Sequence, residues 1–235
     1  MTDRKRPNID FRKYFTRSYV LRYLLILGSQ FFFALGLTML RLSCLGSDPF
    51  SGMAYSISEH WNVPLAAVIA GVNLCLIVFC FLKMPQSIGF GTFVNMVLTG
   101  NFADLWRSLL RDIFGLDLMT GADQLPQRLF MLIAGMLIMV FFCSFYLASE
   151  LGTAPYDYIG YIIEDMTGGR YPFFAARMTC DGICVVVTYL VARMDGTQWQ
   201  LIGFGTIIMV LCIGPLQAFF RKHFADPLVA AIKRL

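Results

Sequence analysis

The stretch Leu45-Gly46-Ser47-Asp48-Pro49-Phe50 returns once, as Leu151-Gly152-Thr153-Ala154-Pro155-Tyr156. Each copy follows a long apolar segment and opens a helix-like stretch of about 13 residues, or about 20 Å, which is too short to span a bilayer. Short segments that Gly and Pro interrupt at matching places in two halves of a chain point to a binding site in transporters. The pair therefore predicts two broken elements that face a common centre.

The composition indicates a polytopic membrane protein. The chain of 235 residues is 57% hydrophobic and 14% charged, whereas soluble domains have roughly 45–50% apolar and about 25% charged residues. The apolar residues form six runs, each of which is long enough to cross about 30 Å of hydrocarbon as a helix. These runs are Tyr19–Leu42, Pro64–Leu82, Ile88–Trp106, Gln127–Ala148, Pro172–Ala192 and Leu201–Phe220.

A second duplication extends the first. Ile88-Gly89-Phe90-Gly91-Thr92 is identical to Ile202-Gly203-Phe204-Gly205-Thr206, and both stretches begin long apolar runs. The sequence therefore predicts an all-α protein of two homologous halves, each with a long helix, a short broken helix and two more long helices. The expected parts are a basic arm (1–18), a membrane repeat (19–106), a linker (107–126), a second membrane repeat (127–220) and a basic amphipathic tail (221–235).

The positive charges predict the orientation of the termini. Lys and Arg residues cluster before the first run and after the last one, so the positive-inside rule predicts that both termini are cytoplasmic. A basic arm beside a membrane span is far commoner than a nucleic-acid-binding arm, and no nucleic-acid partner is expected. The cysteines lie almost entirely inside apolar runs, which indicates no disulfide framework.

The sequence leaves the relation between the halves open. If the short elements do not cross the membrane, each half crosses three times and the halves are inverted. If an extended 44–48 and the following short helix complete a crossing, each half crosses four times and the halves are parallel. The distribution of positive charge slightly favours parallel halves, because Arg107, Arg111 and Arg128 would then lie on the cytoplasmic side.

The two short elements supply the first candidate site residues. Ser47 and Thr153 are candidate hydroxyl N-caps, and Asp48 is a further candidate in the first copy. Pro49 and Pro155 suit the first helical turn, whose amide hydrogens have no partner within the helix. We expect two helix N-termini with positive dipole ends at one cavity; the alternative is a pair of amphipathic turns at the membrane interface.

Charged and polar residues inside the predicted membrane spans supply the remaining candidate site residues. Arg177 and Asp181 lie four residues apart on one predicted helix, so they can form an ion pair. Asn73 occupies the place of Asp181 in the first half, and Asp157 lies in the second short element. This asymmetric set suits a polar or zwitterionic ligand; the alternative is an ion pair that only locks helices together.

Catalytic and cofactor signatures are absent from the sequence. With only two histidines, His60 and His223, histidine-based metal sites and His-dependent triads are improbable. The Gly-x-Gly stretches lack the third glycine and the strand–turn–helix context of a nucleotide-binding loop. We therefore expect neither an enzyme nor a bound cofactor or metal.

The motifs resemble those of the YczE/YyaS/YitT family of bacterial membrane proteins over about residues 20–220. The resemblance rests on the Leu-Gly-x-x-Pro-aromatic stretches at Leu45 and Leu151 and on the Ile-Gly-Phe-Gly-Thr stretches at Ile88 and Ile202. It implies a location in the bacterial cytoplasmic membrane and no assigned activity or site.

These observations together predict a permease or exporter for a small polar molecule, with its site between the two repeats. The alternatives are a substrate-binding membrane subunit and a scaffold or assembly factor of a larger membrane complex. The expected partners are the lipid bilayer, a small polar solute, and either a second copy of the chain or another membrane protein.

Overall fold

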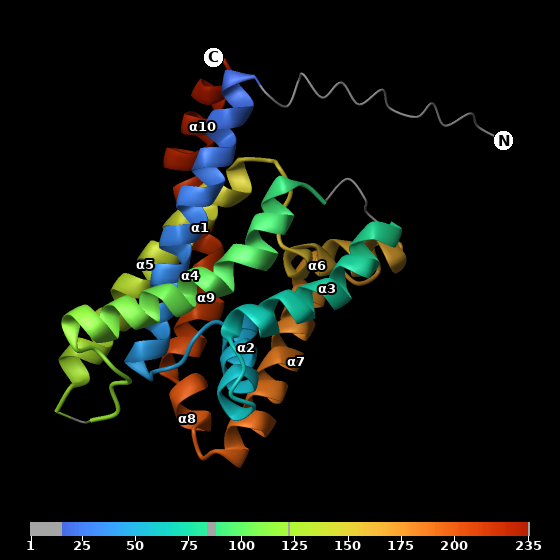
Figure 1. Ribbon diagram of the computed structural model, residues 1–235. Helices are drawn as coiled ribbons and strands as arrows, with labels where there is room; N and C mark the ends of the chain where they lie inside the picture. Colours follow the sequence, from blue (N-terminus) through green and yellow to red (C-terminus); the bar gives the residue numbers. More distant parts are fainter. Residues whose placement is uncertain (1–15, 84–87, 122, 235) are drawn as a thin grey trace.

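The computed structural model describes residues 16–83, 88–121 and 123–234, and the regular secondary structure in these ranges is entirely helical (Figure 1). Most of the predicted basic arm therefore lies outside the described residues. The longer helices are α1 (Arg17–Ser43), α3 (Leu65–Lys83), α4 (Phe90–Phe114), α5 (Leu125–Ala148), α7 (Phe173–Met194) and α9 (Phe204–Phe220). The shorter ones are α2 (Pro49–His60), α6 (Pro155–Met166), α8 (Gln198–Leu201) and α10 (Asp226–Lys233).

Five segments among the described residues are long and apolar enough to cross a membrane. They correspond to α1, α3, α5, most of α7, and the continuous segment from α8 to α10. The sixth predicted run falls in α4, which is 25 residues long but carries Asn95, Asn101 and Asp104 and does not qualify by composition. Large apolar side chains on the outer faces, such as Phe81 (67% exposed) and Leu211 (68% exposed), suit contact with lipid.

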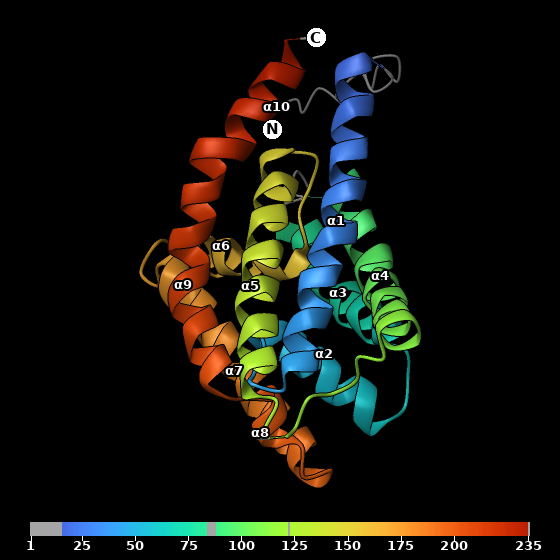
Figure 2. The same cartoon turned by 90° about the vertical axis from the view of Figure 1, so that its left-hand side faces the viewer.

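Helices α1 and α5 lie side by side along the molecule in both views (Figures 1 and 2). Glycines permit this close packing: a Cβ on Gly36 would lie 2.6 Å from the carbonyl oxygen of Gly135. Small residues at such contacts are the usual means by which helices approach closely in membranes. The main core cluster gathers around this contact and includes Ala34, Leu37, Leu40, Leu132, Met136, Met139 and Val140.

Helix α2 returns to the end of the molecule at which α1 finishes. Arg41, near the end of α1, forms a two-point ion pair with Glu59, near the end of α2 (2.7 and 2.6 Å). His60 at the end of α2 contacts Asp195 just after α7 (3.0 Å). With 12 residues, α2 is about 18 Å long, and it does not carry the chain to the opposite end. The end of α2 therefore lies beside the end of α1.

The duplicated stretches meet crosswise. The amide of Gly205, at the start of α9, donates to the carbonyl of Leu45 (2.8 Å), and the amide of Gly91, at the start of α4, donates to the carbonyl of Leu151 (2.8 Å). Each Ile-Gly-Phe-Gly-Thr stretch therefore holds the Leu-Gly stretch from the other part of the chain. These contacts fix the places at which α2 and α6 begin.

The C-terminal tail continues α9 through a π-helical turn, Arg221–Ala225, into α10. Ala225 and Val229 are buried and pack with Phe145 and Ala148 near the end of α5. The predicted amphipathic tail is therefore docked on the helical bundle along its apolar face.

Candidate functional site

The starts of the two short helices meet. The rings of Phe50 in α2 and Tyr156 in α6 have centroids 4.6 Å apart. Met53 and Cys184 complete a small buried cluster around Tyr156, so α7 forms the third side of this centre. From here α2 runs to the end of α7, whereas α6 runs back toward its beginning (Figure 1). The predicted convergence of the two broken elements is thus present.

Arg177 of α7 joins the predicted acidic residues at this centre. Its Nη1 lies 2.9 Å from Asp157 Oδ1 and its Nε lies 3.3 Å from Asp181 Oδ1. The guanidinium carbon also lies 4.3 Å from the ring centroid of Tyr156, a geometry that attracts a cation to an aromatic face. The predicted pair of Arg177 and Asp181 is present, and Asp157 joins it from α6.

Tyr156 links the two carboxylate-bearing helices. Its hydroxyl donates to Asp181 Oδ1 at 2.5 Å, and the thiol of Cys184 donates to the Tyr156 hydroxyl at 3.5 Å. Arg177, Asp157 and Asp181 keep 31%, 37% and 21% of their side chains exposed. The cluster therefore carries two carboxylates for one guanidinium and is accessible from outside the core.

Of the three predicted N-cap candidates, the structure confirms Asp48 and does not support Ser47 or Thr153. Asp48 is the N-cap of α2, and its Oδ2 accepts from the amide of Ser51 at 3.0 Å, while Ala154 occupies this place in α6 without a side-chain cap. The prediction that the hydroxyls of Ser47 and Thr153 cap these helices was wrong, because each lies one residue too early. Asp48 Oδ1 is buried without a hydrogen-bond partner among the described residues.

Ser47 and Thr153 instead hold the loops through their backbones. The amide of Ser47 donates to the carbonyl of Leu201 (3.2 Å), and the carbonyl of Thr153 accepts from the hydroxyl of Thr92 (2.8 Å). Both residues thus belong to the crosswise contacts that position the helix starts.

Asn73 is fully buried in α3 and donates to the carbonyl of Ile69 (3.0 Å). Its Oδ1 has no hydrogen-bond partner in the part of the chain that the structure describes. Within the described ranges, no hydrogen bond joins Asn73 to Arg177, so its predicted place in the same site has no support from hydrogen bonding.

A second polar group escaped the sequence analysis. Arg41 is only 2% exposed and pairs with Glu59, and Arg107 of α4 lies 3.9 Å from the same carboxylate. The sequence signal that could have revealed this polar group is an arginine inside the apolar run Tyr19–Leu42, because a charge in a membrane span needs a partner. Glu59 follows Arg41 by less than twenty residues, but only the return of α2 brings the two together.

The fold and its lipid-facing surface define a helical integral membrane protein. Comparison with known sequences agrees. The chain belongs to a family of unknown function (DUF6198), whose sequence profile matches residues 20–222. It is 23% identical over 223 residues to the uncharacterised membrane protein YczE of Bacillus subtilis (strain 168), and the match covers 92% of each chain. No solved structure matches the chain. The resemblance drawn from the motifs is thereby confirmed.

Proposed function

We propose that the protein is a permease that moves a small polar solute across the bacterial cytoplasmic membrane, with both termini on the cytoplasmic side. The observation that carries the proposal is the meeting of α2 and α6 at their N-terminal ends, beside Arg177. Broken helices whose N-termini converge on charged side chains form the substrate sites of several transporter folds. No enzymatic activity is proposed.

We propose further that the halves are inverted repeats. Three features support this: the crosswise contacts of the duplicated stretches, the matching lengths of α2 and α6 (12 residues each), and the similar backbone of Gly46 (φ 109°) and Gly152 (φ 97°). In such folds, rocking of one repeat against the other exposes a site between them to alternate sides. Here the starts of α2 and α6 would separate and rejoin.

The cluster at the centre has two carboxylates and one guanidinium, and this excess of negative charge restricts which substrates fit. Because Arg177 is already paired with Asp157 and Asp181, a simple anion would have to displace one of them. A proton, or an ammonium group on the solute, would instead neutralise the second carboxylate. A polar solute that carries a cationic group therefore fits this centre better than a simple anion does.

The test is solute flux in proteoliposomes, after a metabolite screen by thermal shift has found ligands that stabilise the purified protein. Asp157→Asn and Arg177→Gln are expected to lower both binding and flux at least tenfold, since each removes a charged partner of the cluster. Arg193→Gln, an exposed site on the same helix, serves as the matched control.

A substrate-binding subunit or a scaffold is the second candidate. It is favoured by the closure of Arg177 onto both carboxylates, which would equally lock α6 to α7. Ligand binding without flux would favour a binding subunit that works with another membrane protein. If no ligand binds, and Arg177→Gln lowers thermal stability alone, the cluster is structural and the permease proposal is wrong.

A further inference from the structure

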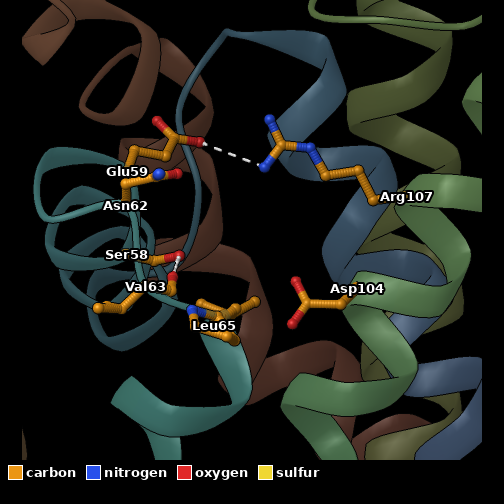
Figure 3. A pocket seen from close by; sticks show the side chains of 8 residues that line it. Ser58, Glu59, Asn62, Val63, Leu65, Asp104 and Arg107 are labelled. Carbon is orange, nitrogen blue, oxygen red and sulfur yellow. Dashed lines mark hydrogen bonds and ion pairs between the residues drawn. The ribbon is translucent and has the colours of Figure 1, made fainter.

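A separate polar cavity of about 520 Å³ lies beside the C-terminal end of α2 (Figure 3). The last turns of α2, the loop into α3, and α4 line this open cavity. The volume is in the range of small-molecule sites. Its lining residues include Ser58, Glu59, Asn62, Leu65, Asp104 and Arg107.

Glu59, on one side of this cavity, is held by an ion pair with Arg41 behind it. Arg41 binds both carboxylate oxygens of Glu59, at 2.7 and 2.6 Å, and is itself 2% exposed. Two-point pairing of this kind fixes the geometry of both side chains. The Glu59 carboxylate is thus held at the cavity edge with its charge already balanced.

Among the described residues around this cavity, Arg107 is the cation without a hydrogen-bonded carboxylate. Its nearest approach to Glu59 is 3.9 Å, beyond hydrogen-bond length, and 39% of its side chain is exposed. Figure 3 shows its guanidinium extending across the cavity toward Glu59. A guanidinium offers five N–H donors in a planar fork that matches a carboxylate.

Asp104 supplies an opposite charge on the same helix. It precedes Arg107 by three residues, so both project from one face of α4. Its carboxylate interacts with the backbone amides of Leu65 and Ala66 at the start of α3, and Figure 3 shows it directed toward Leu65. The four charged groups around the cavity, Arg41, Glu59, Asp104 and Arg107, sum to zero.

We infer that this cavity is a second binding site, for a small zwitterion that carries a carboxylate and an ammonium group. The carboxylate would pair with the guanidinium of Arg107, and the ammonium would lie toward Asp104. A simple anion would pair with Arg107 and leave the charge of Asp104 unmatched, and a simple cation would pair with Asp104 and leave the charge of Arg107 unmatched. This inference does not depend on the permease proposal.

The test is binding of glycine and γ-aminobutyrate to the purified full-length protein by calorimetry and thermal shift. Butyrate and butylammonium, which each carry one of the two charges, are the comparison ligands. We expect at least one zwitterion to bind measurably more tightly than either comparison ligand. Arg107→Gln should raise its dissociation constant about tenfold or more, because a charge-assisted hydrogen bond is lost.

The matched control is Arg111→Gln, one turn further along α4, where the side chain is 63% exposed and pairs with its neighbour Asp112; it should leave binding unchanged. If Arg107→Gln does not fold, Arg107→Lys keeps the charge without the planar fork and should weaken binding. Equal binding of butyrate, or no binding of any probe, would overturn the inference. So would loss of binding in Arg177→Gln but not in Arg107→Gln, which would assign the ligand to the centre and leave the permease proposal intact.

Discussion

Gly46 and Gly152 occupy matching places where the chain has no room for a side chain. A Cβ on Gly46 would lie 2.5 Å from Thr206 Oγ1 and 2.8 Å from the Gly203 amide nitrogen. A Cβ on Gly152 would lie 2.5 Å from the Gly89 amide nitrogen. Both glycines also have φ near +100° (109° and 97°), which side chains disfavour. Each glycine therefore has a backbone conformation that favours glycine, and each also lies in close contact with an Ile-Gly-Phe-Gly-Thr stretch.

We predict that Gly46→Ala and Gly152→Ala each lower the stability of the folded protein by more than the backbone strain alone, which is about 1–2 kcal/mol. The excess comes from the clash, because the opposing atoms belong largely to the backbone and cannot move aside. Gly196→Ala is the control, since Gly196 has φ 70° but nothing within 4 Å of an added Cβ. Thermal unfolding in detergent gives the comparison, and equal losses at Gly46 and Gly196 would show that the crosswise contact is loose.

At the scale of elements, the tail helix α10 is tied to the loop between α5 and α6. Lys233 Nζ lies 2.6 Å from Glu150 Oε2, and this hydrogen bond lowers the pKa of Glu150 below its usual 4.5. Val229 of α10 packs against Phe145 and Ala148 near the end of α5. The tail is therefore held both by apolar contact and by a charge pair at its outer end.

A lowered pKa means that the tie stabilises the folded tail when Glu150 is ionised, and that its contribution is lost as the pH falls below about 4.5 and through the lower folded pKa. Glu150 is 64% exposed, so the contribution is only about 0.2–1 kcal/mol and is weakened by salt. We predict that Glu150→Gln speeds hydrogen exchange in α10 by up to about fivefold at pH 7.

As the pH falls below 4.5 and through the lowered pKa of Glu150, the difference between the variant and the wild type should shrink, because the wild-type carboxyl then loses its charge. Comparing the two proteins at one pH cancels the intrinsic pH dependence of exchange. Asp165→Asn is the control, as Asp165 is exposed at the end of α6. A difference that does not shrink as the pH is lowered would show that Glu150 acts through packing instead.

At the scale of the whole molecule, the ends of α1, α2 and α7 gather together. The pairs Arg41–Glu59 and His60–Asp195 join them, and the amide of Met119 in the linker donates to the carbonyl of Leu42 at the end of α1 (3.0 Å). The loop after α2, the linker and the loop after α7 therefore lie at one end of the bundle. The start of α1 and the end of α10 lie at the other (Figures 1 and 2).

This arrangement predicts the result of a labelling experiment in cells. Single cysteines at Asn62, Gly115 and Gly196, in a background without the native cysteines, should all react with an impermeant maleimide on the same side of the membrane. A cysteine at Gly168, after α6, should react on the opposite side. If the cysteines at 62 and 115 are labelled from the same side as the one at 168, and the one at 196 from the opposite side, α2 completes a crossing. The inverted arrangement is then wrong.

The sequence alone predicted contacts that depend on spacing along one helix. Arg177 and Asp181 are four residues apart, which places them on one helical face whatever surrounds them. The helical membrane class followed from runs of apolar residues, because lipid leaves a spanning segment few other ways to satisfy its backbone. The family resemblance likewise rested on short motifs that can be read directly from the chain.

The cap prediction shows where local signals become imprecise. Ser47, Asp48 and the following proline all favour a helix start, and propensity does not distinguish between adjacent residues. The backbone geometry of the loop decides, and that geometry is set by the contact of Leu45 with Gly205 from the distant start of α9. A partner more than 150 residues away thus determines which side chain caps α2.

By itself, then, the sequence determined that this is a helical membrane protein with two short, proline-led elements and a charged pair on one long helix, because these follow from periodicity and composition. Only the tertiary structure decided that each duplicated stretch contacts the opposite one, that α2 turns back toward the end of α1, and that Asp157 joins Arg177. The physical reason is that these contacts join helices distant in sequence. Which segments contact each other depends on how closely their glycine-containing backbones can pack in space. No local sequence pattern predicts that packing.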